Sequence, residues 1–200
     1  MNWTHEMRSN VREVGAALRE PEAFALRWRE QGEAGVEPLS PVVFLLLALT
    51  AVLCTSAYGL TMGFGQSAGV MIAKGINAPL AAGLAWLISL PTLYIINSLS
   101  GSKLDLPTTT LAALITVSFG ALAMLASVPI NWFFKVAVGT PGFTLFINLV
   151  VFTGVGLSMS DVFVRVMKGL EPDRTFPALW LGLVAAIGSE LFHLLGLFEF

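Results

Sequence analysis

The sequence predicts an all-α fold: a polytopic membrane helix bundle of five transmembrane helices, preceded by short cytoplasmic amphipathic helices. The first observation is composition, because 56% of the 200 residues are hydrophobic and only 12% are charged. Soluble domains carry about 25% charged residues, which cover their surface. The second observation is placement, because five of the 11 basic and seven of the 13 acidic residues fall within residues 1–41. Together they exclude a soluble enzyme, a nucleic-acid-binding protein and a disordered chain.

The uneven charge divides the chain into a cytoplasmic amphipathic segment, 1–41, and a transmembrane domain, 42–200. A helix that crosses a bilayer needs about 20 residues of low charge. Runs of that kind predict spans near 42–64, 79–100, 109–132, 142–163 and 177–198. The stretch 65–77, GQSAGVMIAKGIN, is rich in glycine and less apolar, so we expect a loop or a short interfacial helix there.

Basic residues predict the orientation, because cytoplasmic loops are enriched in lysine and arginine. Five spans put nine of the 11 basic residues on one side of the membrane. These nine are Arg8, Arg12, Arg19, Arg27, Arg29, Lys103, Arg165, Lys168 and Arg174. Only Lys74 and Lys135 fall on the other side. We therefore expect the N-terminus in the cytoplasm and the C-terminus outside.

The N-terminal segment is predicted to form two short amphipathic helices. Its apolar residues recur every three or four positions, which places them on one helical face. They are Trp3, Met7, Val11, Val14 and Leu18, followed after Pro21 by Phe24 and Trp28. Such a face lies on the membrane surface, packs on the spans or binds a partner. Because acids balance the bases here, the lipid surface is disfavoured, and packing on the protein itself is the default.

Small residues inside the spans predict where helices approach one another closely. The spacing G-x-x-x-G or its equivalent joins Gly59 to Gly63, Gly154 to Ser158, and Gly182 to Ala186. We expect these pairs to pack within the bundle, with dimerisation of two copies as the alternative. Pro91 and Pro129 each remove a backbone hydrogen bond and are expected to kink their helices.

Glu190 and His193 are the only ionisable residues within a predicted span away from its margins. Their i, i+3 spacing puts them on one face of the helix. Because an acid within a membrane marks a functional site by default, we consider a proton or cation site formed by Glu190, His193, Asn148 and Thr92. The alternative for Glu190 and His193 is a protonated glutamate, or a Glu–His pair, that is wetted from the outer interface and bonded to a neighbouring helix. For the polar residues Thr92, Asn97, Asn131 and Asn148, hydrogen bonds between helices are favoured over a path for a solute.

The sequence predicts no catalytic residue, no cofactor and no metal site. An E-x-x-H pair needs further ligands, and the only other histidine, His5, lies in the cytoplasmic segment. Gly156-Leu-Ser158 and His193 superficially suggest an intramembrane serine protease, but the topology puts Ser158 and His193 at opposite ends of their spans, beyond the reach of a nucleophile and its base. The single cysteine, Cys54, falls in an apolar run and is expected to be inert.

Several segments resemble a known family. They are Ala57-Tyr58-Gly59-Leu60-Thr61-Met62-Gly63, the stretch 90–104 (LPTLYIINSLSGSKL), Trp180 and Gly188-Ser189. With an amphipathic N-terminal segment and five closely spaced spans, the chain resembles the Yip1-type membrane proteins, above all their small bacterial branch. It departs from that pattern at Glu190 and at its Gly-Leu-Phe-Glu-Phe end. The resemblance implies a trafficking, shaping or scaffold role without catalysis.

Two functions follow from these features. In the first, the chain is a non-enzymatic protein of the bacterial cytoplasmic (inner) membrane, an accessory or scaffold subunit that docks other membrane or cytoplasmic proteins, or a second copy of itself. The expected docking residues are Trp3, Met7, Val11, Leu18, Phe24, Trp28, Arg165, Lys168 and Arg174. In the second, it is a small channel or transporter subunit that uses Glu190 and His193.

Overall fold

The computed structural model describes residues 3–33, 41–173 and 179–198, and these form seven α-helices and no strand. The helices are α1 (Trp3–Arg19), α2 (Pro21–Glu33), α3 (Pro41–Met62), α4 (Ala68–Leu99), α5 (Leu106–Ala137), α6 (Pro141–Leu170) and α7 (Leu179–Leu194). The predicted all-α class and the two N-terminal helices are thereby confirmed.

Within the described residues, four helices are long and apolar enough to cross a membrane: α3, α4, α5 and α6. They have 22, 32, 32 and 30 residues, and a helix of about 20 residues crosses the hydrocarbon core. These lengths support the predicted membrane helix bundle. They do not support five spans, because α7, which lies in the fifth predicted span, has only 16 residues.

The prediction of a loop or short interfacial helix at 65–77 is wrong. A single helix, α4, begins at Ala68, directly after the N-cap Ser67. Glycine and lysine lower the hydropathy of this stretch, and low hydropathy favoured a loop. In the structure, α3 packs against part of the stretch and covers it. Gly75 is buried, and a Cβ added there would come within 2.7 Å of the Leu60 side chain of α3. Tertiary packing therefore extends α4 well beyond its most apolar part.

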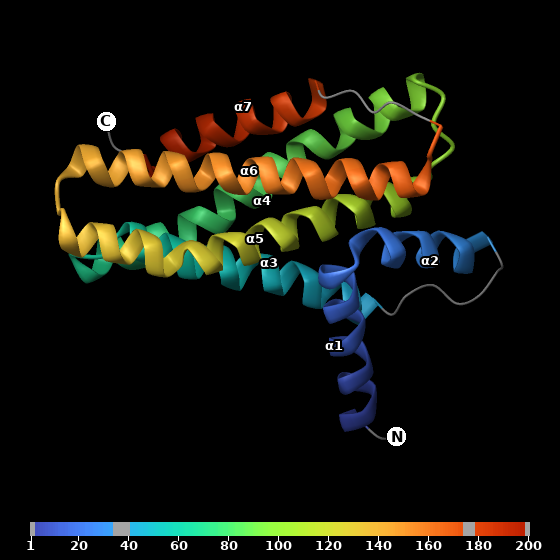
Figure 1. Ribbon diagram of the computed structural model, residues 1–200, viewed down its shortest axis with the longest axis horizontal. Coiled ribbons are helices and arrows are strands. Elements are labelled where there is room, and N and C mark those ends of the chain that lie inside the picture. The colour runs from blue at the N-terminus through green and yellow to red at the C-terminus, as the bar shows by residue number, and fades with distance from the viewer. Residues whose placement is uncertain (1–2, 34–40, 174–178, 199–200) are drawn as a thin grey trace.

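The bundle has two different ends (Figure 1). At one end α2 packs on α6 and α5, and α1 packs on α3 and α5. We call this the capped end, and Figure 1 shows α1 projecting away from the bundle there. At the other end short turns join α3 to α4 and α5 to α6, and we call it the turn end. Gly65 and Gly139 have positive φ in these turns, a conformation that glycine adopts without strain. The last helix, α7, packs on α4.

Close helix contact occurs where α3 meets α4. A Cβ added at Gly59 would lie 2.4 Å from the Lys74 carbonyl oxygen, and one added at Gly63 would lie 2.4 Å from Met71 Cα. This confirms packing within the bundle for the first predicted small-residue pair. Gly154 and Gly182 are exposed, and a Cβ at either position would meet open space. The other two pairs therefore begin on the outer surface of the described bundle.

Candidate functional site

Helix α2 is held on the bundle by its apolar face. Phe24 is only 3% exposed, and Ala25 is buried beside it. Trp28 meets Phe44 of α3 edge to face, with ring centroids 5.6 Å apart. Burying one such side chain contributes about 1.5–3 kcal/mol. Phe24 and Trp28, two of the expected docking residues, are therefore covered by the chain's own bundle.

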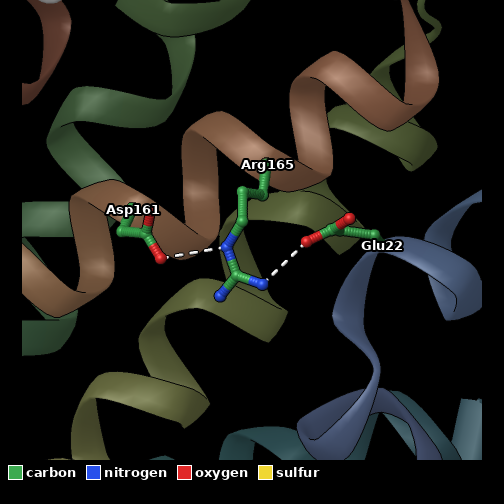
Figure 2. A network of polar contacts seen from close by, with 3 residues as sticks. All are labelled: Glu22, Asp161 and Arg165. Carbon is green, nitrogen blue, oxygen red and sulfur yellow. Dashed lines mark hydrogen bonds and ion pairs between the residues drawn. The ribbon is translucent and has the colours of Figure 1, made fainter.

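A charged network lies over this contact (Figure 2). Arg165 of α6 donates from Nη1 to Glu22 Oε1 of α2 at 2.7 Å and from Nε to Asp161 Oδ2 at 2.9 Å. All three side chains are about half exposed or more, so each pair is worth about 1 kcal/mol or less. Arg165 was expected in the docking surface, and here it orients α2 on α6.

Helix α1 is divided into a packed half and an exposed half. Val14 is buried and Leu18 packs against the same apolar cluster, whereas Met7 and Val11 are 45% and 56% exposed. All four belong to one helical stripe, since they repeat at spacings of three and four. Trp3, which begins this stripe in the sequence, has a side chain outside the described part of the structure. We call Met7 and Val11 the exposed α1 face.

The loops at the capped end are fixed by an acid that the sequence did not single out. Glu171 accepts from Ser102 Oγ at 2.7 Å and from the Lys103 backbone N–H at 2.9 Å, which ties the α4–α5 loop to the end of α6. Lys168 is exposed in the last turn of α6. Arg174, the third basic residue expected to dock a partner, lies outside the described residues.

The structure does not bring the four predicted intramembrane polar residues together. Glu190 and His193 are both exposed on α7. Asn148 of α6 is buried near the turn end and accepts from Tyr58 Oη at 2.8 Å. Thr92 of α4 lies toward the capped end, next to the buried Leu93. Among the described residues, no group of three His, Cys, Asp or Glu side chains could hold a metal ion.

A buried polar network at the turn end confirms the expected hydrogen bonds between helices for Asn131 and Asn148, although the sequence did not predict their partners. It joins three helices: Tyr58 of α3 bonds to Asn148 of α6, and Asn131 Nδ2 of α5 donates to Thr61 Oγ1 of α3 at 2.9 Å. Lys135 of α5 donates to the backbone carbonyls of Thr61 and Met62, at the end of α3. The partners lie 70 to 90 residues apart in the chain, so no local pattern signals them.

This network borders a pocket of about 410 Å³ between the turns and the ends of α3, α4, α5 and α6. Its described lining is Met62, Phe64, Gly65, Gln66, Lys74, Lys135, Val136, Gly139, Pro141, Thr144, Leu145, Asn148 and Leu197. Lys74 is only 6% exposed although it carries a charge. Asn148 is the one predicted site residue among this lining, and both lysines had been used only to predict orientation.

The chain matches no protein-family model, no curated protein and no solved structure. The resemblance to Yip1-type proteins therefore rests on the sequence motifs alone.

Proposed function

We propose that this chain is a non-enzymatic, multi-pass membrane protein that acts as an accessory or scaffold subunit of a membrane complex, with a Yip1-like architecture. The exposed α1 face is the observation that carries the proposal. The apolar stripe of α1 is buried against the bundle at Val14 and continues, uncovered, to Val11 and Met7. A helix anchored at one end, with bare apolar residues at the other, offers a ready-made surface for a partner.

The occupant we propose for this face is a cytoplasmic protein with an apolar groove and an acidic rim. Arg8 and Arg12 are exposed directly beside Met7 and Val11, and they would meet such a rim. The bilayer surface is a weaker candidate, because Glu6 and Glu13 share this helix and anionic lipids favour a uniformly basic face. The projection of α1 away from the bundle also supports a partner outside the spanning helices (Figure 1).

The proposed topology has the N-terminus and the capped end in the cytoplasm of a bacterium and the C-terminus outside its inner membrane. Here α7 and its flanking residues form a fifth span beside α4. The basic residues support this arrangement, since nine of 11 would face the cytoplasm. A C-terminal fusion to a reporter that is active only outside the cytoplasm should be active. An inactive fusion would contradict either the fifth span or the orientation.

The docking role is tested by replacing the exposed α1 face. The double variant M7S/V11S should lose the proteins that cross-link to a photoreactive residue at position 10 and co-purify in mild detergent. Loss is expected because the apolar contact area disappears while the anchored half of α1 stays in place. The matched control is H5Q/S9A, which changes two exposed residues, four positions apart, on the opposite face of α1. Equal recovery from M7S/V11S and H5Q/S9A would overturn the proposal.

A channel or transporter subunit is the alternative, and it depends on Glu190 and His193 as a proton or cation site. Both side chains are exposed on α7, and neither lines the pocket. Two variants separate the functions. The scaffold proposal expects complex assembly to survive E190Q and to be abolished when residues 1–30 are deleted. A transporter expects the reverse, with ion flux lost in E190Q while assembly stays intact.

A further inference from the structure

Helix α4 carries large exposed apolar side chains along nearly its whole length. They are Ile72, Ile76, Leu80, Leu87, Ile88, Ile95 and Leu99, and each is 47% exposed or more. At the helical rise of 1.5 Å per residue, this row extends for about 40 Å. The hydrocarbon core of a bilayer is about 30 Å thick, so a helix that crosses it upright would leave part of the row in water.

Helix α6 becomes charged on its exposed side well before it ends. Phe146 and Leu157 are 57% and 68% exposed. Asp161 and Arg165 follow, with side chains 67% and 47% exposed, and then the exposed Lys168. Residues 141–160 extend for about 30 Å, which is one hydrocarbon thickness. Since charged side chains are costly in hydrocarbon, α6 leaves the membrane core near Asp161.

Contacts through α5 show which part of α3 lies level with Asp161. A Cβ added at Gly120 of α5 would come within 2.2 Å of Met159 Sδ of α6. Two residues earlier in α5, Ser118 Oγ donates to the Leu47 carbonyl of α3 at 2.9 Å. Because α5 and α6 run in opposite directions, two residues back from Gly120 correspond to two residues onward from Met159. Asp161, Ser118 and Leu47 therefore lie at about the same level of the bundle.

The contact between α3 and α4 extends this comparison to α4. Gly59 faces the part of α4 between Lys74 and Ala78, since an added Cβ would lie 2.4 Å from the Lys74 carbonyl oxygen and 2.8 Å from Ala78 Cβ. These two helices also run in opposite directions. The 12 residues from Gly59 back to Leu47 thus correspond to about 12 residues onward along α4, which reach Ile88. The apolar row of α4 is therefore at Ile88 where the charged part of α6 begins.

Beyond this level, toward the capped end, the two helices present different surfaces. Ile95 and Leu99 lie about 10 and 16 Å further along α4, and they are 55% and 84% exposed. Lys168, seven residues beyond Asp161 on α6, is about level with Ile95. A membrane plane perpendicular to the bundle would therefore place either Asp161 in hydrocarbon or Leu99 in water. A continuous row of large apolar side chains marks an interaction surface rather than a water-facing one.

From these observations we propose that the bundle crosses the bilayer obliquely, so that the last three turns of α4, from Ile88 to Leu99, contact lipid acyl chains. Helix α6 and the helix α2 packed on it lie in water at the same level. Acyl chains are the occupant because these turns continue, without a charged residue, the apolar row of the spanning part of α4. Figure 1 shows the end of α4 and α2 on opposite sides of the bundle at the capped end, as an oblique crossing requires.

Transmembrane helices tilt by up to about 40°, so such a crossing lies within the observed range. The inference concerns how the bundle lies in the bilayer. It depends neither on the docking role of α1 nor on which side of the membrane the capped end faces.

Spin labels at matched positions test the inference on the full chain in phosphatidylcholine vesicles. Each label is attached to a single cysteine, I95C or K168C, in a C54A background. In lipid, a label collides with dissolved oxygen, whereas in water it collides with a soluble nickel complex. Oxygen should dominate at I95C and the nickel complex at K168C, because the two positions are level but belong to different surfaces. L157C, which is exposed on α6 before its charges begin, is the lipid control.

Three results would overturn the proposal. Equal access of the nickel complex to I95C and K168C would mean an upright bundle with the end of α4 in water. Oxygen dominating at both positions would place the end of α6 in the membrane as well. Exclusion of both reagents from I95C would mean that a protein, rather than lipid, covers α4.

A second position and a second variant keep the test decisive. Should I95C fail to fold, L99C, which is one turn further on and 84% exposed, answers the same question. M7S/V11S, the variant that should lose docking, should leave the accessibility at I95C and K168C unchanged. Failure of the docking role and failure of the oblique crossing are thereby distinguished.

Discussion

The capped end and the turn end of the bundle bury different chemistry. At the capped end, α1 and α2 close an apolar cluster that includes the fully buried Leu111, Ile115 and Val166, and the charged groups lie outside it. At the turn end, the Tyr58–Asn148 hydrogen bond is buried beside an open pocket that holds two lysines. Both ends bury uncharged polar side chains, such as Thr108 and Thr109 at the capped end and Asn131 and Asn148 at the turn end, but the described turn end also buries a charged residue, Lys74, beside a pocket.

The two ends differ in the contacts that hold their helices together. Apolar burial at the capped end stabilises the attachment of α2 and the packed half of α1, which fixes the direction in which the exposed α1 face points. Buried polar groups contribute little net stability and are costly when unpaired. At the turn end the Tyr58–Asn148 and Asn131–Thr61 hydrogen bonds pair such groups between helices.

The largest effect on stability is expected from a substitution at the turn end, where α3 and α4 are in close contact. Gly59→Leu would place a side chain against the backbone of α4, because even a Cβ would lie 2.4 Å from the Lys74 carbonyl oxygen. The unfolding free energy in detergent should fall by about 3 kcal/mol or more. Gly154→Leu, which meets open space, is the control and should change it little. Equal effects of the two variants would mean that α3 and α4 do not pack as described.

The next largest effect on stability is expected at the capped end, where Phe24 holds α2 on the bundle. Phe24→Ala removes a side chain that is 3% exposed, and should cost about 3 kcal/mol by leaving a cavity under α2. Limited proteolysis should then cut between α2 and α3 faster than in the wild type. Leu26→Ala, in the same helix but exposed, is the control. Unchanged proteolysis of Phe24→Ala would show that α2 is held by other contacts.

The membrane bundle was predictable because hydropathy reports the solvent of each segment directly. The first predicted span, 42–64, differs from α3 by only one residue at its start and two at its end. The helix ends were harder: α6 continues from the predicted end at 163 to Leu170, because its last turns pack on α2 rather than lie in an apolar run. Apolar periodicity in a sequence identifies the face of a helix that will be buried, but it does not identify the element that buries it.

The candidate site was predictable only in part for the same reason. Met7 and Phe24 both lie on predicted apolar helix faces, yet Met7 is exposed and Phe24 is buried. The distinction depends on the angle at which α1 leaves the bundle, which is a tertiary property. The lysines of the pocket were visible as charges, but Lys74 and Lys135 come to line one pocket only because α4 and α5 both pack on α3.

A smaller effect tests the polar network of the turn end. Tyr58→Phe leaves Asn148 Oδ1 without the hydrogen bond that Tyr58 Oη donates, and should lower the unfolding free energy by about 1–2 kcal/mol. Asn148→Leu should cost a similar amount because it strands the tyrosine hydroxyl. The double variant Y58F/N148L should cost less than the sum of the two, since neither group is then unpaired. Strict additivity in this double-mutant cycle would show that the pair does not interact.

The smallest effect belongs to the charged network over α2. In a double-mutant cycle of Glu22→Gln and Arg165→Gln, the coupling energy should be about 0.5 kcal/mol, because both side chains are nearly half exposed and water competes for them. Raising NaCl to about 1 M should abolish the coupling, since screening at that concentration acts over about 3 Å. The same salt should leave the cost of Phe24→Ala unchanged, because apolar burial does not depend on charge. A coupling energy above about 2 kcal/mol, or one that salt does not reduce, would mean that the ion pair rather than Phe24 holds α2, and the capped end would then be anchored by charge.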